Sequence, residues 1–363
     1  MAFRAEDVAK LFALDGEPML AVPFGHGHIN DTYFVETSRA RKYILQRVNG
    51  TIFADMPGLM NNIYLTTSHI RHKVAQNGGD PLRECLSIVD TKDGNRHVVI
   101  DGNYWRCYIY IDNAITMQTT ETPELFRIAG AAFGIFQRQL SDFPAEKLID
   151  VIPNFHNTPW RYGNFEKART EDKFDLAKNA REEILFVREH AELCSLLTDK
   201  LESGELPLRV THNDTKINNV MLDRATGKPL AVIDLDTVMP GLSAYDFGDS
   251  IRSGATYAAE DEPDVDKVVF ETELFDKYAE GFLSECGSVF SKEEVLSLYT
   301  GSVLMTFECG MRFLTDYLSG STYFKISYPE HNLVRCRTQF ALVKQILAKK
   351  DELEAILLKY WKK

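Results

Sequence analysis

The sequence predicts an α+β fold in which a small strand-rich domain precedes a larger helical one. Short strand-like runs, separated by polar or Gly-containing turns, fill the first third of the 363-residue chain. From Glu124 onward the period changes, and one helical face is traced by Leu125, Ile128, Ala129, Ala132, Phe133 and Phe136. The change falls near Asp112, so we expect domains at residues 1–111 and 112–363.

The first domain is predicted to contain six strands, each rich in β-branched and aromatic residues. They are residues 19–24, 32–36, 42–47, 86–89, 97–100 and 104–111, and one helix, residues 59–76, interrupts them. The second domain should hold a helix from residue 124 and further helices over 165–202, 270–284, 291–318 and 331–361. Residues 153–164, which are rich in Pro, Asn and aromatics, are predicted to form a loop.

The composition excludes several classes of protein. With 44% hydrophobic residues the chain can bury a substantial core, and its net charge of −12 argues against a nucleic-acid-binding surface. Charges interrupt the apolar residues near the N-terminus and no segment resembles a membrane span, so we expect a cytoplasmic protein without a membrane partner. Six widely spaced cysteines without a C-x-x-C pair are typical of buried free thiols.

The stretch RVTHNDTKINNVMLDRATGKPLAVIDLD (209–236) predicts a β-hairpin with polar residues at its ends. If its strands pair about the turn at Thr226–Gly227, Asn219 lies directly opposite Asp234. Opposed Cβ atoms lie roughly 4.5–5.5 Å apart, so an amide and a carboxylate oxygen could share one divalent cation. This inference depends on the register, because a slip of one residue turns a side chain to the other face.

Asp214 lies five residues before Asn219 and is the candidate general base. A carboxylate there can orient a hydroxyl group and accept its proton during phosphoryl transfer. His212 is expected to brace the loop. The alternative is a capped turn over residues 212–214, but the joint pattern H-x-D-x(4)-N, turn, strand ending in I-D is far more specific than an isolated H-x-D.

In these residues the chain resembles the aminoglycoside phosphotransferase and choline kinase family, which has a two-lobed protein-kinase-like fold. The resemblance covers both domains and is strongest over residues 210–252. It implies a small, mainly antiparallel β lobe that binds ATP and a larger helical lobe for catalysis and acceptor binding. It also implies that Asp214 is the catalytic base and that Asn219 and Asp234 hold Mg²⁺ on the nucleotide.

Asp246-Phe247-Gly248 spells the metal-binding motif of protein kinases, but it lies outside the hairpin, 32 residues after Asp214. We therefore assign the metal to Asp234. The resemblance implies that Asp246 starts the next helix and braces the catalytic loop through hydrogen bonds to its backbone. For Asp236 two interpretations are open, a contact with the second metal or water shell and a solvated strand end.

The first domain lacks the ion pair that kinase-like folds place between a strand Lys or Arg and a helix Glu. The motif YILQRVN offers Gln46 or Arg47, and no Glu occurs between Met56 and Gln76. A hydrogen bond between Gln46 and an Asn of this helix would fix the same geometry. Gly25 and Gly27 fit either a phosphate-approaching turn or a plain hairpin turn. The nucleotide-binding candidates are Gly25, Gly27, Gln46 and Arg47.

Within this family, IPNFHNT, DFGDSIR and ECGMRFLTDYLSGSTYF resemble kinases that phosphorylate the anomeric 1-hydroxyl of N-acetylglucosamine or N-acetylgalactosamine. That resemblance implies that Arg312 and Tyr323 line the sugar pocket. Glu308, Arg312 and Asp316 share one helix face, for which a surface ladder of salt bridges is the alternative. The substrate-binding candidates are His28, Asn30, Glu308, Arg312 and Tyr323.

Two rival functions follow from the same residues. One is a kinase of this fold for another small acceptor, such as an aminoglycoside, choline, homoserine or methylthioribose. Aminoglycosides and choline are cationic, and a pocket centred on Arg312 disfavours them. The other rival is a nucleotide-binding regulatory protein with a degenerate site, suggested by the missing ion pair.

Overall fold

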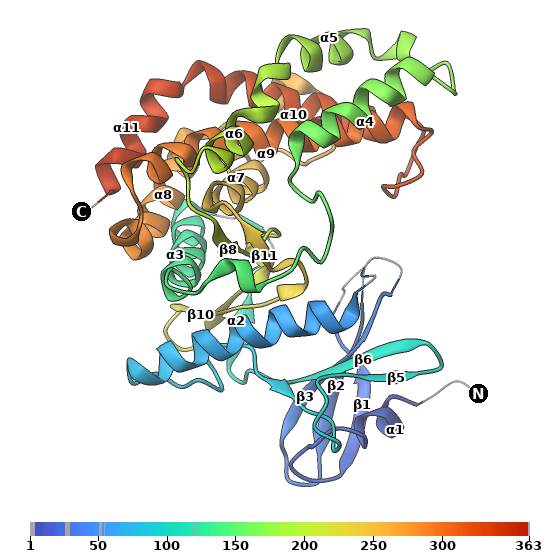
Figure 1. The fold of residues 1–363 in the computed structure, drawn as a ribbon, viewed down its shortest axis with the longest axis vertical. Helices are drawn as coiled ribbons and strands as arrows, with labels where there is room; N and C mark the ends of the chain where they lie inside the picture. The colour runs from blue at the N-terminus through green and yellow to red at the C-terminus, as the bar shows by residue number, and fades with distance from the viewer. Residues whose placement is uncertain are drawn as a thin grey trace. The chain divides into compact units, whose positions relative to one another are not determined.

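The computed structural model describes residues 4–25, 30–50, 53, 55–117, 119–120 and 122–361. The chain divides into two compact units, each assembled from separate stretches of sequence (Figure 1). Unit 1 comprises Met1–Ile115, Glu146–Pro153 and Met221–Met239, and unit 2 comprises Thr116–Ala145, Asn154–Val220 and Pro240–Lys363. Unit 1 carries an antiparallel sheet and unit 2 is mainly helical, which confirms the predicted fold class.

Unit 1 is built on a sheet of six strands in the part of the chain that the structure describes. The order is β1 (Pro18–Pro23), β2 (Asp31–Thr37), β3 (Lys42–Val48), β6 (Asn103–Ile109) and β4 (Ile88–Val89), with β5 (Val98–Ile100) paired to β6. All six predicted strands are present, with ends within two residues of those predicted. The helix α2 (Met56–Gln76) begins three residues before its predicted start, where the Asp55 side chain accepts a hydrogen bond from Gly58 N.

The two faces of this sheet have different roles. A short helix that was not predicted, α1 (Ala5–Ala9), and the adjoining Phe12 pack against a row of side chains that includes Leu45, Trp105 and Cys107. Because successive strand residues point to opposite faces, Gln46 and Arg106 belong to the other face. The sequence alternation therefore places two polar side chains together on the face away from α1.

The predicted hairpin forms, but with a different register. Its strands are β9 (Val220–Asp223) and β10 (Pro229–Val232), which join β7 (Ala114–Thr116) in a three-stranded sheet. Asp223 N donates to Lys228 O at 2.9 Å, and Gly227 N donates to Asp223 O at 2.8 Å. With Gly227 at a φ of 68°, this is a G1 bulge, which adds one residue to the second strand.

The bulge makes Asp223 the partner of Lys228, so the predicted register centred on Thr226–Gly227 is wrong. Asn219 and Asp234 also lie outside the strands. Asn219 ends a 3-10 helix (Ile217–Asn219) directly before β9, and Asp234 directly precedes a second one (Leu235–Thr237). Asn219 precedes the first strand of the hairpin and Asp234 follows the second, so they are not a cross-strand pair.

Unit 2 consists mainly of helices. These are α3 (Pro123–Gln139), α4 (Thr158–Glu171), α5 (Arg181–Glu189), α6 (Leu196–Glu202), α7 (Ser243–Gly254), α8 (Thr272–Cys286), α9 (Lys292–Leu318), α10 (His331–Ala348) and α11 (Lys350–Tyr360). The predicted helical stretches 165–202 and 331–361 are each broken into shorter helices. The predicted loop over 153–164 is wrong in its second half, because the Asn157 side chain caps α4 by accepting from Trp160 N at 3.0 Å.

Helices α7 and α9 pack so closely that their backbones are in contact where they cross. A Cβ atom on Gly248 would overlap the carbonyl oxygen of Gly301, and one on Gly301 would overlap that of Ala244. Phe247 is fully buried in the same region. The Asp-Phe-Gly run therefore serves helix packing, which brings α7, with Asp246, against α9, with Glu308.

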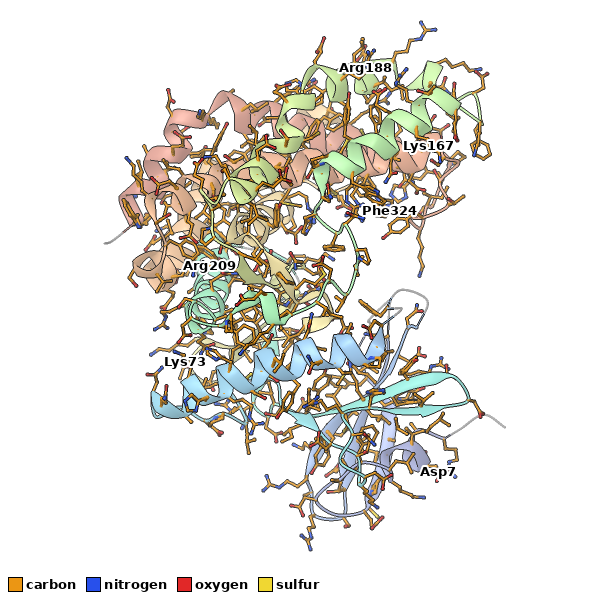
Figure 2. All side chains as sticks on the ribbon, in the orientation of Figure 1. Asp7, Lys73, Lys167, Arg188, Arg209 and Phe324 are labelled. Carbon is orange, nitrogen blue, oxygen red and sulfur yellow. The ribbon has the colours of Figure 1, made fainter. Side chains whose placement is uncertain are left out.

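The strand that leads into the loop over residues 212–219 is anchored to α9 by an arginine. Arg209, labelled in Figure 2, begins β8 (Arg209–Thr211), which pairs with β11 (Met239–Gly241). Its Nε donates to Glu294 at 2.9 Å, and Glu294 also closes the capping box at the start of α9. The start of the loop is thereby held to a rigid helix end.

All six cysteines are free thiols, as predicted. Across the described ranges, none of the helices combines the length and apolar character needed to cross a bilayer.

Candidate active site

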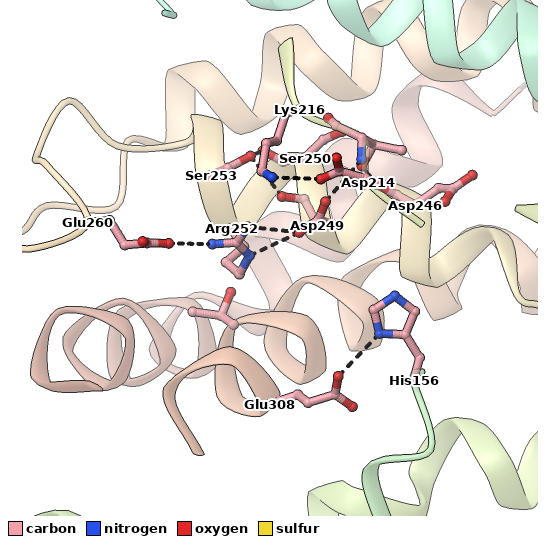
Figure 3. A network of polar contacts seen from close by, with 12 residues as sticks. His156, Asp214, Lys216, Asp246, Asp249, Ser250, Arg252, Ser253, Glu260 and Glu308 are labelled. Carbon is pink, nitrogen blue, oxygen red and sulfur yellow. Dashed lines mark hydrogen bonds and ion pairs between the residues drawn. The ribbon is translucent and has the colours of Figure 1, made fainter. Parts of the chain in front are cut away.

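The catalytic loop of unit 2, residues 212–219, is held by two carboxylates of α7. Asp246 accepts hydrogen bonds from His212 N at 2.9 Å and Asn213 N at 2.8 Å, and Asp249 accepts one from Thr215 N at 3.0 Å (Figure 3). Asn213 adopts a left-handed conformation with a φ of 63°, which turns the chain between the two anchoring points. The expected contact of Asp246 with the loop backbone is therefore present.

The anchoring groups are themselves buried. Burial raises the pKa of the Asp246 carboxyl, although His212 and the bonds from the loop backbone and Gln137 act in the opposite direction. Gln137 Nε2 donates to Asp246 at 2.9 Å. His212 packs edge-on against Phe133 and Phe136, and its Nδ1 accepts from Asp214 N at 3.3 Å. These contacts give the loop one defined shape.

Asp214 keeps part of its carboxylate in solvent and lies beside a cation. Its side chain is 28% exposed, and Lys216 Nζ is 2.8 Å from Asp214 Oδ1. Although desolvation acts in the opposite direction, the charge and hydrogen bond of Asp214 raise the pKa of Lys216. A cation is therefore held next to the candidate base at neutral pH.

The side-chain amide of Asn219 is oriented by the backbone of Asp214. Its Nδ2 donates to the backbone oxygen of Asp214 at 2.8 Å, and no described residue donates to its Oδ1. Asp234, in unit 1, is exposed and has a φ of 62°. An amide and a carboxylate oxygen are the hard donors that Mg²⁺ prefers. Within the described ranges, no group of three or more His, Cys, Asp or Glu side chains is arranged to hold a metal ion.

The other polar face of the unit 1 sheet holds a buried network around Asp236. Thr32, Gln46 and Arg106 are direct neighbours across β2, β3 and β6. Arg106 is 2% exposed, its Nη2 donates to Asp236 Oδ2 at 2.9 Å, and its Nη1 bonds the other carboxylate oxygen. Asn30 Nδ2 also donates to Asp236, at 2.8 Å. The interpretation of Asp236 as a solvated strand end is therefore wrong.

Gln46 and Asn62 have separate partners, so the predicted hydrogen bond between Gln46 and an Asn of α2 is wrong. Gln46 accepts from Arg106 Nε at 2.9 Å and donates to Thr32 Oγ1 at 3.1 Å. Asn62, on α2, donates to Ile149 O at 2.8 Å and to Val238 O at 2.9 Å. The segment after Asp234 is thus held both by Arg106 and by Asn62.

The remaining candidates of unit 1 lie around the same strands. Arg47, on the opposite strand face from Gln46, is exposed and its Nε donates to Asp31 at 2.6 Å. Asn30 uses both ends of its amide, because its Oδ1 also accepts from Asn49 N at 3.1 Å. Gly25 has a φ of 75°, as in a turn. Gly27 and His28 lie outside the described residues.

The surface-ladder interpretation of α9 is wrong, because both of its carboxylates are buried and bonded outside the helix face. Glu308 is fully buried and accepts from Thr158 Oγ1 at 2.6 Å. Asp316 accepts the backbone N–H groups of Thr322 at 3.0 Å, Tyr323 at 2.9 Å and Phe324 at 3.0 Å. Asp316 thereby fixes the segment that carries Tyr323.

Arg312 and Tyr323 are neighbours in unit 2. The guanidinium carbon of Arg312 lies 6.0 Å from the ring centroid of Tyr323 and 5.6 Å from that of Phe324. Tyr323 is 72% exposed. Within the described part of the chain Arg312 makes no ion pair, so its charge is not neutralised by direct contact with a carboxylate.

A pocket of about 680 Å³ adjoins the catalytic loop inside unit 2. It is lined by Thr215–Asn218 of the loop, by Ser253 and Gly254 at the end of α7, by residues 256–259 after it, and by Phe126 and Tyr278. This volume lies in the range of small-molecule sites. Its wall is rich in hydroxyl groups, and Lys216 lies among its lining residues.

Three groups of predicted residues come together. Asp214 lies with His212, Asn219 and Asp246. Asp236 lies with Asn30 and Gln46, and Arg312 lies with Tyr323. Sequence reasoning missed Arg106, Lys216, His156 and Arg161, and it gave Asn62 a different partner. Arg106 had a signal, since it is the one charge in the strand NYWRCYI. His156 stands in the quoted motif IPNFHNT, but neither its role nor that of Arg161 was readable, because both depend on Glu308, more than 140 residues away.

The chain is similar to known phosphotransferases in sequence and in fold. A family model described as the phosphotransferase enzyme family matches residues 21–280. An aminoglycoside phosphotransferase from Alicyclobacillus acidocaldarius is similar in structure with a TM-score of 0.61 and 14% identity, over 99% of this chain and 98% of that one.

Two further solved structures share the fold. An amicoumacin kinase in complex with AMP-PNP and Ca²⁺ has a TM-score of 0.55 and 14% identity, over 96% of this chain and 91% of that one. A choline kinase from Cryptosporidium parvum has a TM-score of 0.53 and 14% identity, over 92% and 91% of the two chains. At such low identity these likenesses establish the kinase-like fold, as predicted, and no acceptor.

Proposed function

Because this chain belongs to the phosphotransferase enzyme family, we propose that it is an ATP- and Mg²⁺-dependent kinase for the anomeric 1-hydroxyl of an N-acetylhexosamine. The products are ADP and the 1-phosphate of N-acetylglucosamine or N-acetylgalactosamine. The observation that carries the choice of acceptor is Arg312, which lies beside the exposed ring of Tyr323 without a carboxylate partner among the described residues.

Asp214 acts as the general base in this proposal. It orients the acceptor hydroxyl and takes its proton as the oxygen bonds to the γ-phosphorus and the bond to the β–γ bridging oxygen breaks. The anomeric hydroxyl is the most acidic of the sugar hydroxyls, so one carboxylate suffices. Lys216, 2.8 Å from Asp214, offers its charge to the transferred phosphoryl group.

Asn219 and Asp234 would hold magnesium, which when bound neutralises charge on the nucleotide phosphates. The nucleotide-binding candidates remain Gly25, Gly27, Gln46 and Arg47. In place of a Lys–Glu pair, the buried pair of Arg106 and Asp236 fixes the segment that carries Asp234. A site with ordered supports for the base and for both metal ligands favours an enzyme over a degenerate regulatory protein.

The charges around Arg312 favour an uncharged acceptor. An aminoglycoside or choline brings positive charge, and a nearby guanidinium without a bound carboxylate repels it. Glu308 offers no compensation, because it is fully buried and already contacts Arg161 and His156. An acetamido sugar brings no charge, and its carbonyl oxygen accepts hydrogen bonds from a guanidinium.

The test is ADP release, measured with a coupled assay, in the presence of N-acetylglucosamine, N-acetylgalactosamine, choline or kanamycin. We expect turnover with one or both hexosamines, dependence on Mg²⁺, and none with the cationic acceptors. Turnover with choline or kanamycin alone would overturn the acceptor assignment. Magnesium-dependent ATP binding without turnover of any acceptor would favour the regulatory function.

A further inference from the structure

His156 is a buried histidine beside the helix that braces the catalytic loop. Its side chain is 8% exposed and its Nδ1 lies 3.2 Å from Glu308 Oε1 (Figure 3). The ring packs against Phe155, with centroids 4.6 Å apart, and against Tyr245 of α7, at 5.1 Å. Since Tyr245 directly precedes Asp246, the ring lies next to the support of the loop that carries Asp214.

The contact with Glu308 determines which ring nitrogen carries hydrogen. Burial alone would raise the pKa of Glu308, but the hydrogen bond from His156 and the charges of His156, Arg161 and Arg312 lower it. An ionised carboxylate only accepts hydrogen bonds, so Nδ1 of His156 is the protonated nitrogen. In the neutral ring, Nε2 is then an acceptor with a fixed direction.

Nε2 itself is buried and has no hydrogen-bond partner in the described part of the chain. Figure 3 shows it on the side of the ring away from Glu308. Buried polar atoms in proteins are nearly always hydrogen-bonded. An unpaired buried nitrogen therefore indicates a partner outside the described residues, and a bound ligand can be such a partner.

The surrounding charges restrict what that group is. Burial and the nearby charge of Arg312 lower the pKa of Arg161 to about 10. Arg161 Nε contacts Glu308 at 3.3 Å, and the more distant charge of Arg312 also acts on this carboxylate, so two guanidinium charges and a histidine surround one carboxylate. The site therefore has more donors than acceptors. It suits a ligand with carbonyl or hydroxyl oxygens for the arginines and one N–H or O–H for His156, and it repels protonated amines.

We propose that His156, oriented by Glu308, is a specificity-determining residue that accepts the amide N–H of the acceptor's acetamido group. Arg161 and Arg312 supply donors for the oxygens of the same acceptor. This inference rests on the proposed sugar kinase function and deepens it, because it names the residue that separates an N-acetylhexosamine from the parent hexose and from the protonated hexosamine.

A matched pair of substitutions tests the two nitrogens separately. His156→Asn keeps a donor near the Nδ1 position and removes Nε2, whereas His156→Gln places a polar atom near Nε2. We expect His156→Asn to raise the KM for N-acetylglucosamine about tenfold, the usual effect of one lost hydrogen bond, with the KM for ATP and the melting temperature unchanged. His156→Gln should recover part of the loss. His72→Asn, at an exposed position on α2, is the matched control.

The substrate comparison separates recognition from a structural role. For the wild type we expect a higher kcat/KM with N-acetylglucosamine than with glucose or glucosamine, and His156→Asn should reduce the difference between N-acetylglucosamine and glucose. Equal losses on all three sugars would overturn the inference while the kinase function stands. No turnover of any hexosamine by the wild type would overturn the function.

Binding provides a readout that does not need turnover. The imidazole ¹⁵N signals of His156, assigned by their loss in His156→Asn, should shift when N-acetylglucosamine is added to the protein with a non-hydrolysable ATP analogue and Mg²⁺. Signals that stay unchanged at saturating sugar would contradict the proposal, since no group of the sugar would then reach Nε2.

Discussion

Arg106 and Asp236 form a buried two-point ion pair inside unit 1. Arg106 is 2% exposed and Asp236 is 5% exposed, and both oxygens of the carboxylate accept from the guanidinium. Asp236 lies two residues after the candidate metal ligand Asp234, so the pair ties this segment to the middle of the sheet. It supplies a fixed link in a domain whose helix α2 contains no Glu.

Removing the arginine should therefore leave a buried carboxylate without its counter-charge. We expect Arg106→Gln to lower the free energy of unfolding by about 3–5 kcal/mol, measured by urea denaturation. The matched control is Arg39→Gln, because Arg39 is 73% exposed and pairs with Asp15 at the surface. That change should cost no more than about 1 kcal/mol. Equal effects of the two substitutions would show that the buried pair does not hold the sheet to the Asp234 segment.

Removing the charge of Asp214 and removing that of Asp234 should impair different steps, turnover in the first case and nucleotide binding as well in the second. For Asp214→Asn we expect kcat to fall at least about 10²-fold, as for a lost general base, with ATP affinity nearly unchanged. For Asp234→Asn we expect weaker binding of Mg²⁺-ATP as well, seen in calorimetric titrations with and without Mg²⁺. Near-normal turnover of Asp214→Asn would exclude it as the base.

The Arg83–Asp223 contact predicts a pH-dependent stabilisation of the hairpin. Arg83 Nη2 donates to Asp223 at 2.6 Å, and Thr226 N donates to the same carboxylate at 2.8 Å. The hydrogen bond from Arg83, followed by those from Thr226, lowers the pKa of Asp223 from 3.8 to about 2. A lowered carboxyl pKa stabilises the folded state above the unfolded pKa, and this contribution is lost as the pH falls through the folded value.

We therefore expect the difference in melting temperature between wild type and Asp223→Asn to be constant from pH 5 to 7 and to shrink as the pH falls from about 4 toward 2. Differential scanning fluorimetry at a series of pH values measures it. A difference that stays the same at pH 3 would mean that the Asp223 charge contributes nothing to the hairpin.

Gly248 should not tolerate a methyl group. Alanine normally stabilises a helix interior by about 1 kcal/mol over glycine, but a Cβ here would overlap Gly301 O. We expect Gly248→Ala to destabilise the protein by about 1–3 kcal/mol through overpacking. Gly163→Ala is the matched control, because Gly163 lies inside α4 and its Cβ would meet nothing within 4 Å. That variant should be as stable as the wild type or more so, and the opposite order in thermal unfolding would refute the close crossing of α7 and α9.

Local patterns in the sequence predicted the kind and order of most elements and located the candidate base loop. Alternation with period two marks β3, and period 3.6 marks α3, because each pattern records which face of one element is buried. The spacing of Asp214 and Asn219 was also readable, since residues five apart on a short loop remain neighbours whatever the packing. The register of the hairpin was not, because one glycine in a left-handed conformation inserted a bulge.

Only the tertiary structure decided the partners of the buried charges. Asp236 could be read as a solvated strand end and Glu308 as part of a surface ladder, since a carboxylate looks the same in sequence whether it is exposed or enclosed. Arg106 meets Asp236 across 130 residues, and His156 meets Glu308 across 152. Such pairs form because packed strands and helices bring distant side chains together, and sequence periodicity describes each element without specifying its neighbour.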